Sequence, residues 1–225
     1  MRQAAEKQVN HENIMIICAH PDDEIIGCGG TIAKYTLEGK KVHTLIMSYG
    51  EGSHPWLKEN KIRNVRINES SHAGKIVGTS DTTFIGVTDG MFRDDILKNP
   101  AVIDIVKDHI IRINPDKIFT HSYDDILFYD HKMTYNTVIK AAKRANYQGE
   151  IYSFNIWNPI NVRKRNLPKL TVDITNTFSR KIKALNCFKS QKMALYQLTP
   201  VVYIRAIFHG IEKGFKFAEI FYKVK

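Results

Sequence analysis

Side chains suited to chemistry cluster in a hexapeptide near the N-terminus, AHPDDE, which spans residues 19–24. It offers the imidazole of His20 and the carboxylates of Asp22, Asp23 and Glu24. Carboxylates this close repel one another unless a cation, hydrogen bonds or solvent offsets their charge. Taken alone, the hexapeptide is consistent both with a solvated turn and with a metal site.

A second cluster of the same kind lies further along the chain. His121 is followed by Asp124 and Asp125, and the segment ends in Asp130 and His131. Two histidines and one aspartate, with a fourth position left to water, match the ligand count of a catalytic zinc site. Cysteine-rich structural zinc is excluded because the sequence contains no C-x-x-C pair. We therefore interpret His131 as a metal ligand, since it accompanies the first cluster, rather than as a surface histidine.

The elements that position these clusters alternate between strands and helices. Short apolar runs predict strands at 13–18, 42–47, 83–87 and 117–120. Amphipathic patterns predict helices at 61–77, at 101–113, from His131 toward 145, and through Ile32, Tyr35 and Leu37 up to Gly39. This order predicts an α/β fold with a Rossmann-like, mostly parallel sheet flanked by helices. Both clusters follow strands, and ligands bind beyond the carboxyl ends of parallel strands.

Length and composition favour one ordinary globular domain over residues 1–225. The first dozen residues are polar and charged, without the apolar core of a signal peptide. No stretch approaches the roughly 18 consecutive apolar residues of a membrane span. Three cysteines cannot pair evenly, which favours reduced thiols. We therefore expect a cytoplasmic protein without a transmembrane segment, and the sequence leaves open whether it forms a homo-oligomer.

Positive charge is concentrated in the last third of the chain. Residues 151–225 carry 14 lysines and arginines against three acidic residues, whereas the first 150 residues are nearly balanced. Such a surface can steer an anionic ligand or simply be solvated. Nucleic acid is not expected as a partner, because the cations are scattered and no binding motif accompanies them. The run Arg163-Lys164-Arg165 suggests contact with a phosphate of a nucleotide-linked or lipid-linked substrate.

A glycine cluster after the first predicted strand raises the alternative of a dinucleotide site. Gly27, Gly29 and Gly30 lie where such folds bind phosphate at a helix N-terminus. However, the sequence G-C-G-G lacks the G-x-G-x-x-G spacing. The preceding carboxylates would also face the pyrophosphate, so this alternative is disfavoured.

The segment AHPDDEIIGCGGTIAKY resembles the signature of the PIG-L/LmbE deacetylase superfamily. Similarity continues along nearly the whole chain, at Arg66-x-x-Glu69, at residues 86–90 (GVTDG), at 121–131, at Ser190-Gln191 and through 205–221. The resemblance implies that His20, Asp23 and His131 bind Zn²⁺. Fe²⁺ or another divalent ion would fit the same donors, because histidine and carboxylate do not select zinc strongly.

The resemblance also implies a reaction and a substrate class. Asp22 is expected to be the general base, and Asp130 the carboxylate that orients a neighbouring histidine. Arg66 and Asp89 match positions that contact the sugar in relatives. The expected function is removal of the N-acetyl group from an N-acetylhexosamine, of the GlcNAc type, within a small-molecule conjugate.

The sequence departs from the family pattern at Phe128. Relatives often read His-Pro-Asp-His where this chain reads Phe128-Tyr129-Asp130-His131. The first of those histidines, which stabilises the oxyanion or acts as an acid, is therefore absent. Either His121 or Tyr129 replaces it, or zinc and backbone donors stabilise the oxyanion alone. Two alternatives follow: an amidase acting on another acyl-amine conjugate, and a catalytically weakened relative that binds a sugar or metal.

Overall fold

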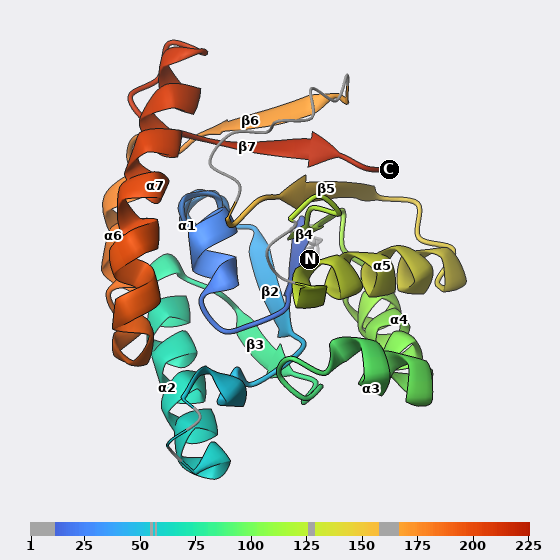
Figure 1. Ribbon diagram of the computed structural model, residues 1–225. Helices are drawn as coiled ribbons and strands as arrows, with labels where there is room; N and C mark the ends of the chain where they lie inside the picture. The colour runs from blue at the N-terminus through green and yellow to red at the C-terminus, as the bar shows by residue number, and fades with distance from the viewer. Residues whose placement is uncertain (1–11, 55, 57, 126–128, 158–166) are drawn as a thin grey trace, which may run out of the picture.

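The protein is built around one twisted sheet, shown edge-on between two sets of helices in Figure 1. The computed structural model describes residues 12–54, 56, 58–125, 129–157 and 167–225. In this part the sheet has seven strands in the order β3-β2-β1-β4-β5-β7-β6. They are β1 (Asn13–Cys18), β2 (Lys41–Ile46), β3 (Asp81–Phe84), β4 (Lys117–His121), β5 (Glu150–Phe154), β6 (Lys169–Asp173) and β7 (Ala218–Lys223). The first five are parallel, and β7 pairs antiparallel with both β5 and β6.

Strand β1 is the centre of the core because it is apolar on both faces. Ile14 and Ile16 pack into one hydrophobic cluster, and Met15 and Ile17 pack into the other. All four side chains are fully buried. Alternate residues of a strand point to opposite sides, so a continuous apolar run is what a sheet covered on both faces requires.

Helices cover both faces of the sheet. One face packs against α1 (Asp23–Leu37), α2 (Glu59–Val77), α6 (Phe178–Leu185) and α7 (Lys192–Ile211). The other packs against α3 (Phe92–Lys98), α4 (Ala101–Ile113) and α5 (Tyr129–Arg144). Two short 3₁₀ turns, Glu51–Ser53 and Lys189–Gln191, complete the described elements. The predicted α/β class with a Rossmann-like sheet is confirmed. No described helix combines the length and apolar character needed to cross a bilayer.

Most predicted elements agree with the structure to within two residues, and two predictions were wrong. The third strand runs from Asp81 to Phe84 rather than from 83 to 87, because Gly86, with a φ of 87°, breaks the extended backbone inside the predicted range. The first helix begins at Asp23, well before the apolar pattern that starts at Ile32, so the glycine cluster lies inside it.

Close packing explains why glycines occupy the first helix. A Cβ atom on Gly27 would come within 2.5 Å of the Phe154 ring, and one on Gly30 within 2.6 Å of Ile174. The glycines therefore let α1 lie close to its neighbours. The phosphate-binding alternative is not supported, because these residues follow the helix N-terminus rather than form the loop before it.

Candidate active site

The two predicted clusters come together at one end of the sheet. His20, Asp22 and Asp23 follow β1, and His121 ends the adjacent parallel strand β4. His131 lies in the first turn of α5. The chain continues from β1 to β2 on one side and from β4 to β5 on the other, so the strand order reverses between β1 and β4. Open α/β sheets bind their ligands at such a point.

A pocket of about 380 Å³ opens at this point. Its wall contains His20, Asp22, Asp23, Arg66, Asp89, Asp130 and His131, together with residues of the 3₁₀ turns, of the segment after β5 and of the first turns of α7. All seven residues selected from the sequence therefore line the same pocket. Phe128 and the Arg163–Arg165 run lie outside the described residues.

One oxygen of Asp23 is surrounded by imidazole nitrogens. Its Oδ2 lies 3.4 Å from Nδ1 of His20, 3.5 Å from Nε2 of His131 and 3.2 Å from Nε2 of His121. Burial alone would raise the pKa of Asp23, but the neighbouring His131 holds it well below its ordinary value. Asp23 is therefore a carboxylate, the protonation state that metal binding requires.

The spacing of His20, Asp23 and His131 fits a small divalent cation. Donor atoms of the three residues all lie within 4.8 Å of one another. Ligands at about 2.1 Å in a tetrahedron lie about 3.4 Å apart. The separations of 3.4 Å and 3.5 Å from Asp23 to the two histidines agree with that edge length.

Carboxylates orient both of these imidazoles. Nδ1 of His131 lies 2.9 Å from Oδ2 of Asp125, so its Nε2 points at Asp23. Nε2 of His20 lies 3.0 Å from Asp89 and 3.4 Å from Asp130, so its Nδ1 faces Asp23. Metal-binding histidines in proteins commonly use the second ring nitrogen in this way, which fixes the tautomer.

Sequence reasoning did not identify Asp125 as the partner of His131. Its carboxylate also accepts hydrogen bonds from the backbone N–H groups of Ile156 (3.1 Å) and Trp157 (3.4 Å). Asp125 thereby connects His131, on α5, to the segment that follows β5. The only signal for it in the sequence was its membership of the second acidic cluster.

His121 is a fully buried neighbour of the site rather than part of the pocket wall. Its ring stacks on His131 with centroids 3.9 Å apart, and its Nε2 accepts a hydrogen bond from the backbone N–H of Ala19 at 3.0 Å. Burial, reinforced by His131, lowers the pKa of His121 to about 4. His121 is therefore a neutral ring beneath the site. Tyr129, the other residue considered as a replacement for the missing histidine, is half exposed at the start of α5.

Asp22 occupies an unusual backbone position between β1 and α1. Its φ of 117° is rare for a residue with a side chain, and such conformations cluster at functional sites. Its Oδ2 lies 3.3 Å from Arg66. Burial raises the pKa of Asp22 to about 7, even though the Arg66 charge lowers it.

Arg66 and Asp89 build the opposite wall of the pocket. The guanidinium of Arg66 is almost fully buried and donates to the carbonyl oxygens of Pro21 and Gly50 as well as to Asp22. Asp89 accepts from the backbone N–H of Gly52 at 3.0 Å while its other oxygen faces His20. Both side chains therefore hold the site together as well as lining it.

Glu24 is a buried acid behind Asp22, and no role was predicted for it from the sequence. It accepts from the backbone N–H of Asp22 at 2.9 Å and pairs with the Ser70 hydroxyl at 3.0 Å. Burial raises the pKa of Glu24 to about 8. Glu24 is therefore protonated at neutral pH and supports the loop that carries Asp22.

Known proteins are similar to this chain in sequence and in fold. A relative in Pseudomonas putida, named 4-oxalmesaconate hydratase, is 25% identical over 214 residues, covering 87% of this chain and 80% of the relative. A Bacillus cereus protein named "Probable N-acetyl-alpha-D-glucosaminyl L-malate deacetylase 2" is 23% identical, covering 83% of this chain and 87% of the relative. The crystal structure of the 4-carboxy-2-hydroxymuconate hydratase GalB from Pseudomonas putida matches with a TM-score of 0.81 and 22% identity, covering 95% of this chain and 96% of that one.

A family model spans the part of the chain that builds the site. The model described as "GlcNAc-PI de-N-acetylase" matches residues 15–142, from within β1 to within α5. This match includes both clusters and more than half of the chain. The protein with the His20, Asp23 and His131 cluster belongs to the PIG-L family.

Proposed function

We propose that this protein is a metal-dependent hydrolase that removes the N-acetyl group from an N-acetylhexosamine unit, of the GlcNAc type, within a conjugate. The observation that carries the proposal is the donor cluster of His20, Asp23 and His131 beside the carboxylate of Asp22. These three residues would hold Zn²⁺, or another divalent ion such as Fe²⁺. The family membership and the deacetylase name of the Bacillus cereus relative support the reaction type.

The chain supplies a general base, Asp22, whose pKa lies near neutral pH. A divalent ion bound there would acidify a water and polarise the acyl oxygen. Asp22, whose pKa is about 7, accepts the proton of the attacking water. That proton then passes to the amine nitrogen as the C–N bond breaks, so that amide and water become amine and acetate. Arg66, which also lines the pocket, orients the Asp22 carboxylate by donating a hydrogen bond to it.

The pocket has the size and lining that a sugar requires. Its volume of about 380 Å³ lies in the range of small-molecule sites. Asp89, Ser53 and Gln191 offer hydrogen-bonding groups for hydroxyls, and Trp157 offers a ring surface for the apolar side of a pyranose. This combination supports a carbohydrate conjugate rather than a purely apolar amide.

A second candidate is hydration of a carbon–carbon double bond. It is favoured by the similarity to the Pseudomonas putida hydratase, which extends over most of both chains. Phe128 also stands where deacetylase relatives often carry a histidine. Hydration needs the same first step, removal of a proton from water by Asp22 while the oxygen bonds to one carbon of the double bond. The proton then goes to the other carbon instead of to a leaving amine.

Substrate assays separate the two candidates. Metal-replete protein is incubated with free, nucleotide-linked and lipid-linked N-acetylglucosamine, and separately with 4-oxalmesaconate. The proposal predicts chelator-sensitive release of acetate from one of the sugars. Loss of the absorbance of the conjugated double bond, with no acetate released, would establish the hydratase instead. Asp22→Asn should lower either activity about 10²-fold or more while retaining the metal.

A further inference from the structure

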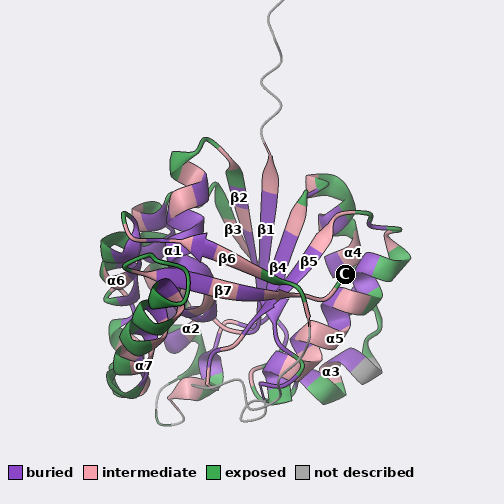
Figure 2. Cartoon of the chain, turned by 90° about the horizontal axis from the view of Figure 1, so that it is seen from above, coloured by how far each residue is buried: buried purple, intermediate pink, exposed green. Residues whose placement is uncertain are grey.

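Helix α7 exposes an uncharged apolar face. Seven of the fifteen large apolar side chains that the described part exposes lie on this one helix. Six of them define the α7 apolar face, namely Met193, Tyr196, Ile204, Ile207, Phe208 and Ile211. Their spacing places them within one arc of about a third of the helix circumference. Figure 2 shows exposed stretches along α7 beside its buried ones.

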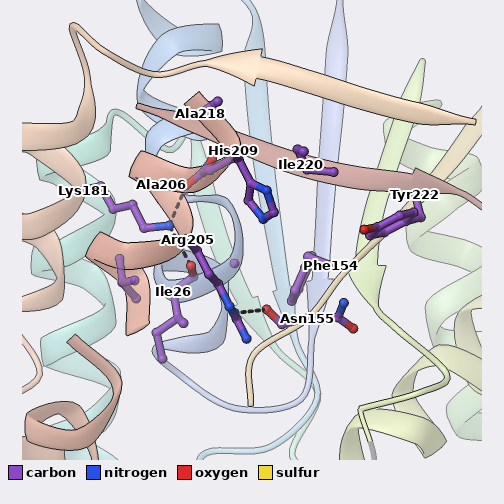
Figure 3. A pocket seen from close by; sticks show the side chains of 13 residues that line it. Ile26, Phe154, Asn155, Lys181, Arg205, Ala206, His209, Ala218, Ile220 and Tyr222 are labelled. Atoms are coloured by element: carbon purple, nitrogen blue, oxygen red, sulfur yellow. Dashed lines mark hydrogen bonds and ion pairs between the residues drawn. The ribbon is translucent and has the colours of Figure 1, made fainter. Parts of the chain in front are cut away.

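A different face of α7 already packs against the core, so the exposed apolar residues are additional to those that attach the helix to the sheet. Leu195, Leu198, Val202 and Ala206 are buried against the sheet. Figure 3 shows Arg205 reaching from α7 toward the chain after β5, where it donates to the carbonyl oxygen of Asn155 at 2.9 Å. A helix that is apolar around its whole circumference is normally covered on its outer face as well as on its inner face.

Cations lie at both ends of the α7 apolar face and on neighbouring α6. Lys189 and Lys192 lie at its N-terminal end, and Lys213 and Lys216 follow its C-terminal end; all four are exposed. Arg180 and Lys183 are exposed on neighbouring α6. Glu212 is the only acidic residue between 178 and 217. A groove of about 620 Å³ between α6 and α7 has an apolar floor, with Lys189 and Lys192 on its wall.

We propose that α7 binds the surface of an anionic membrane. Its apolar face enters the boundary between headgroups and acyl chains, and the surrounding lysines meet lipid phosphates. A helix that lies in the interface plane needs this combination of an apolar face and flanking cations, and it need not span the bilayer. The charge distribution selects an anionic surface over a neutral one.

The same charges disfavour a second copy of this chain as the partner. Two copies joined through α7 would bring their lysines together, where like charges repel.

Membrane binding would also place the active-site pocket beside the lipid. Gln191, Ala194 and Leu198, at the start of α7, line that pocket. Met193 and Tyr196, within the same turn, are 86% and 83% exposed. If the proposed function holds, its substrate is therefore a lipid-linked amino sugar presented from the membrane surface.

Vesicle sedimentation tests the binding directly. The purified full chain is mixed with vesicles of phosphatidylcholine alone, or of equimolar phosphatidylcholine and phosphatidylglycerol. We expect binding to the anionic vesicles, at least tenfold weaker binding to the neutral ones, and loss of binding at high salt. Phe208→Ser/Ile211→Ser should lower the affinity for anionic vesicles at least tenfold. Failure of the wild-type chain to bind anionic vesicles would overturn the proposal.

A matched control uses exposed isoleucines on the other side of the sheet. Ile105→Ser/Ile111→Ser, on α4, also removes two exposed large apolar side chains, without touching α7. This variant should bind vesicles as wild type does. Light scattering in solution adds a second readout. If the wild type is an oligomer that only the α7 variant dissociates, and neither binds vesicles, then the α7 face contacts a second copy and the proposal is wrong.

An activity comparison separates this inference from the proposed function. Acetate release is measured from lipid-linked N-acetylglucosamine in anionic vesicles and from its water-soluble headgroup. The α7 variant should lose activity at least tenfold on the vesicles and keep it on the soluble headgroup. No acetate from either substrate, in the wild type, would contradict the proposed function but leave the vesicle-binding result standing. Equal activity of both proteins on both substrates would contradict the membrane role alone.

Discussion

The carboxylate of Asp125 lies 2.9 Å from Nδ1 of His131 and so directs the other ring nitrogen, Nε2, toward Asp23. Asp125 has almost no exposed surface, and its oxygens also hold the backbone N–H groups of Ile156 and Trp157. The histidine is therefore oriented before any ligand arrives. A hydrogen-bonding carboxylate of this kind raises the basicity of the ring and fixes its tautomer.

Asp125→Asn should weaken metal binding without destroying it. We expect the affinity for Zn²⁺ to fall about 10–100-fold, because the amide no longer accepts the Nδ1 proton as strongly. Calorimetric titration of the chelator-treated protein measures this value. Asp108→Asn, which changes an exposed aspartate on α4, is the control and should bind as wild type. Unchanged affinity in Asp125→Asn would show that the carboxylate does not support the site.

Arg66 should set the pH at which the proposed base works. Its charge lowers the pKa of Asp22, which burial raises to about 7. In Arg66→Met the pKa of Asp22 should rise by about one unit, since an opposite charge is lost. Because the base acts only when deprotonated, the acid limb of the kcat/KM profile should move to higher pH.

The control for that shift is another arginine of α2. Arg63, which lies over the ring of Tyr49, is outside the pocket wall. Arg63→Met should leave the acid limb in place. If both variants keep the wild-type profile, the titration that limits activity belongs to another group.

Glu24 should make the metal-free protein less stable as pH rises. Burial raises its folded-state pKa to about 8 from an ordinary 4.5, so the folded protein holds this proton more tightly than the unfolded chain. That contribution to stability is complete below about 4.5 and is lost as pH approaches about 8. A pKa difference of one unit corresponds to about 1.4 kcal/mol.

Glu24→Gln tests the effect, because an amide keeps the hydrogen bonds without titrating. Urea unfolding of both proteins with chelator present should show similar stability at acid pH. The variant should become the more stable one, by more than about 1.4 kcal/mol, near pH 8. Curves that stay parallel over this range would mean that Glu24 is not protonated in the fold.

Two helix glycines should respond to alanine in opposite directions. Gly30→Ala in α1 would place a methyl group within 2.6–2.9 Å of the Ile174 side chain, and overpacking of this kind costs about 1–3 kcal/mol. Gly74→Ala in α2 meets nothing closer than 3.6 Å and should stabilise by about 0.5–1 kcal/mol. Urea unfolding measures both. Equal effects would contradict the packing explanation for the α1 glycines.

The sequence predicted the parallel half of the fold well because its signals are local. The buried run of β1 and the amphipathic pattern of α4, which ends at Asn114, each lie within one segment. The start of α1 was misplaced because its first turns carry buried carboxylates and glycines that serve the site and the packing. The C-terminal elements were not assigned. Strand β6 is a partly buried edge strand without a continuous apolar run, and α7 is apolar on its solvent side as well as its inner side.

For the site, the sequence identified the residues but not their contacts. The pocket contains all seven selected residues because each follows or faces the end of a strand. Which carboxylate supports which histidine depends on how the two loops meet in space. Asp125 rather than the adjacent Asp130 contacts His131, and Asp130 faces His20. No spacing rule distinguishes these two arrangements.

The most direct test of the central claim combines metal content with acetate release in three proteins, the wild type, Asp22→Asn and His131→Ala. The wild type should bind one zinc ion and release acetate from one N-acetylglucosamine conjugate, losing this activity with chelator and regaining it with added zinc. Asp22→Asn should bind the metal as tightly but act about 10²-fold more slowly or worse, and His131→Ala should lose the metal. Acetate release by metal-free protein, or full activity in Asp22→Asn, would contradict the account.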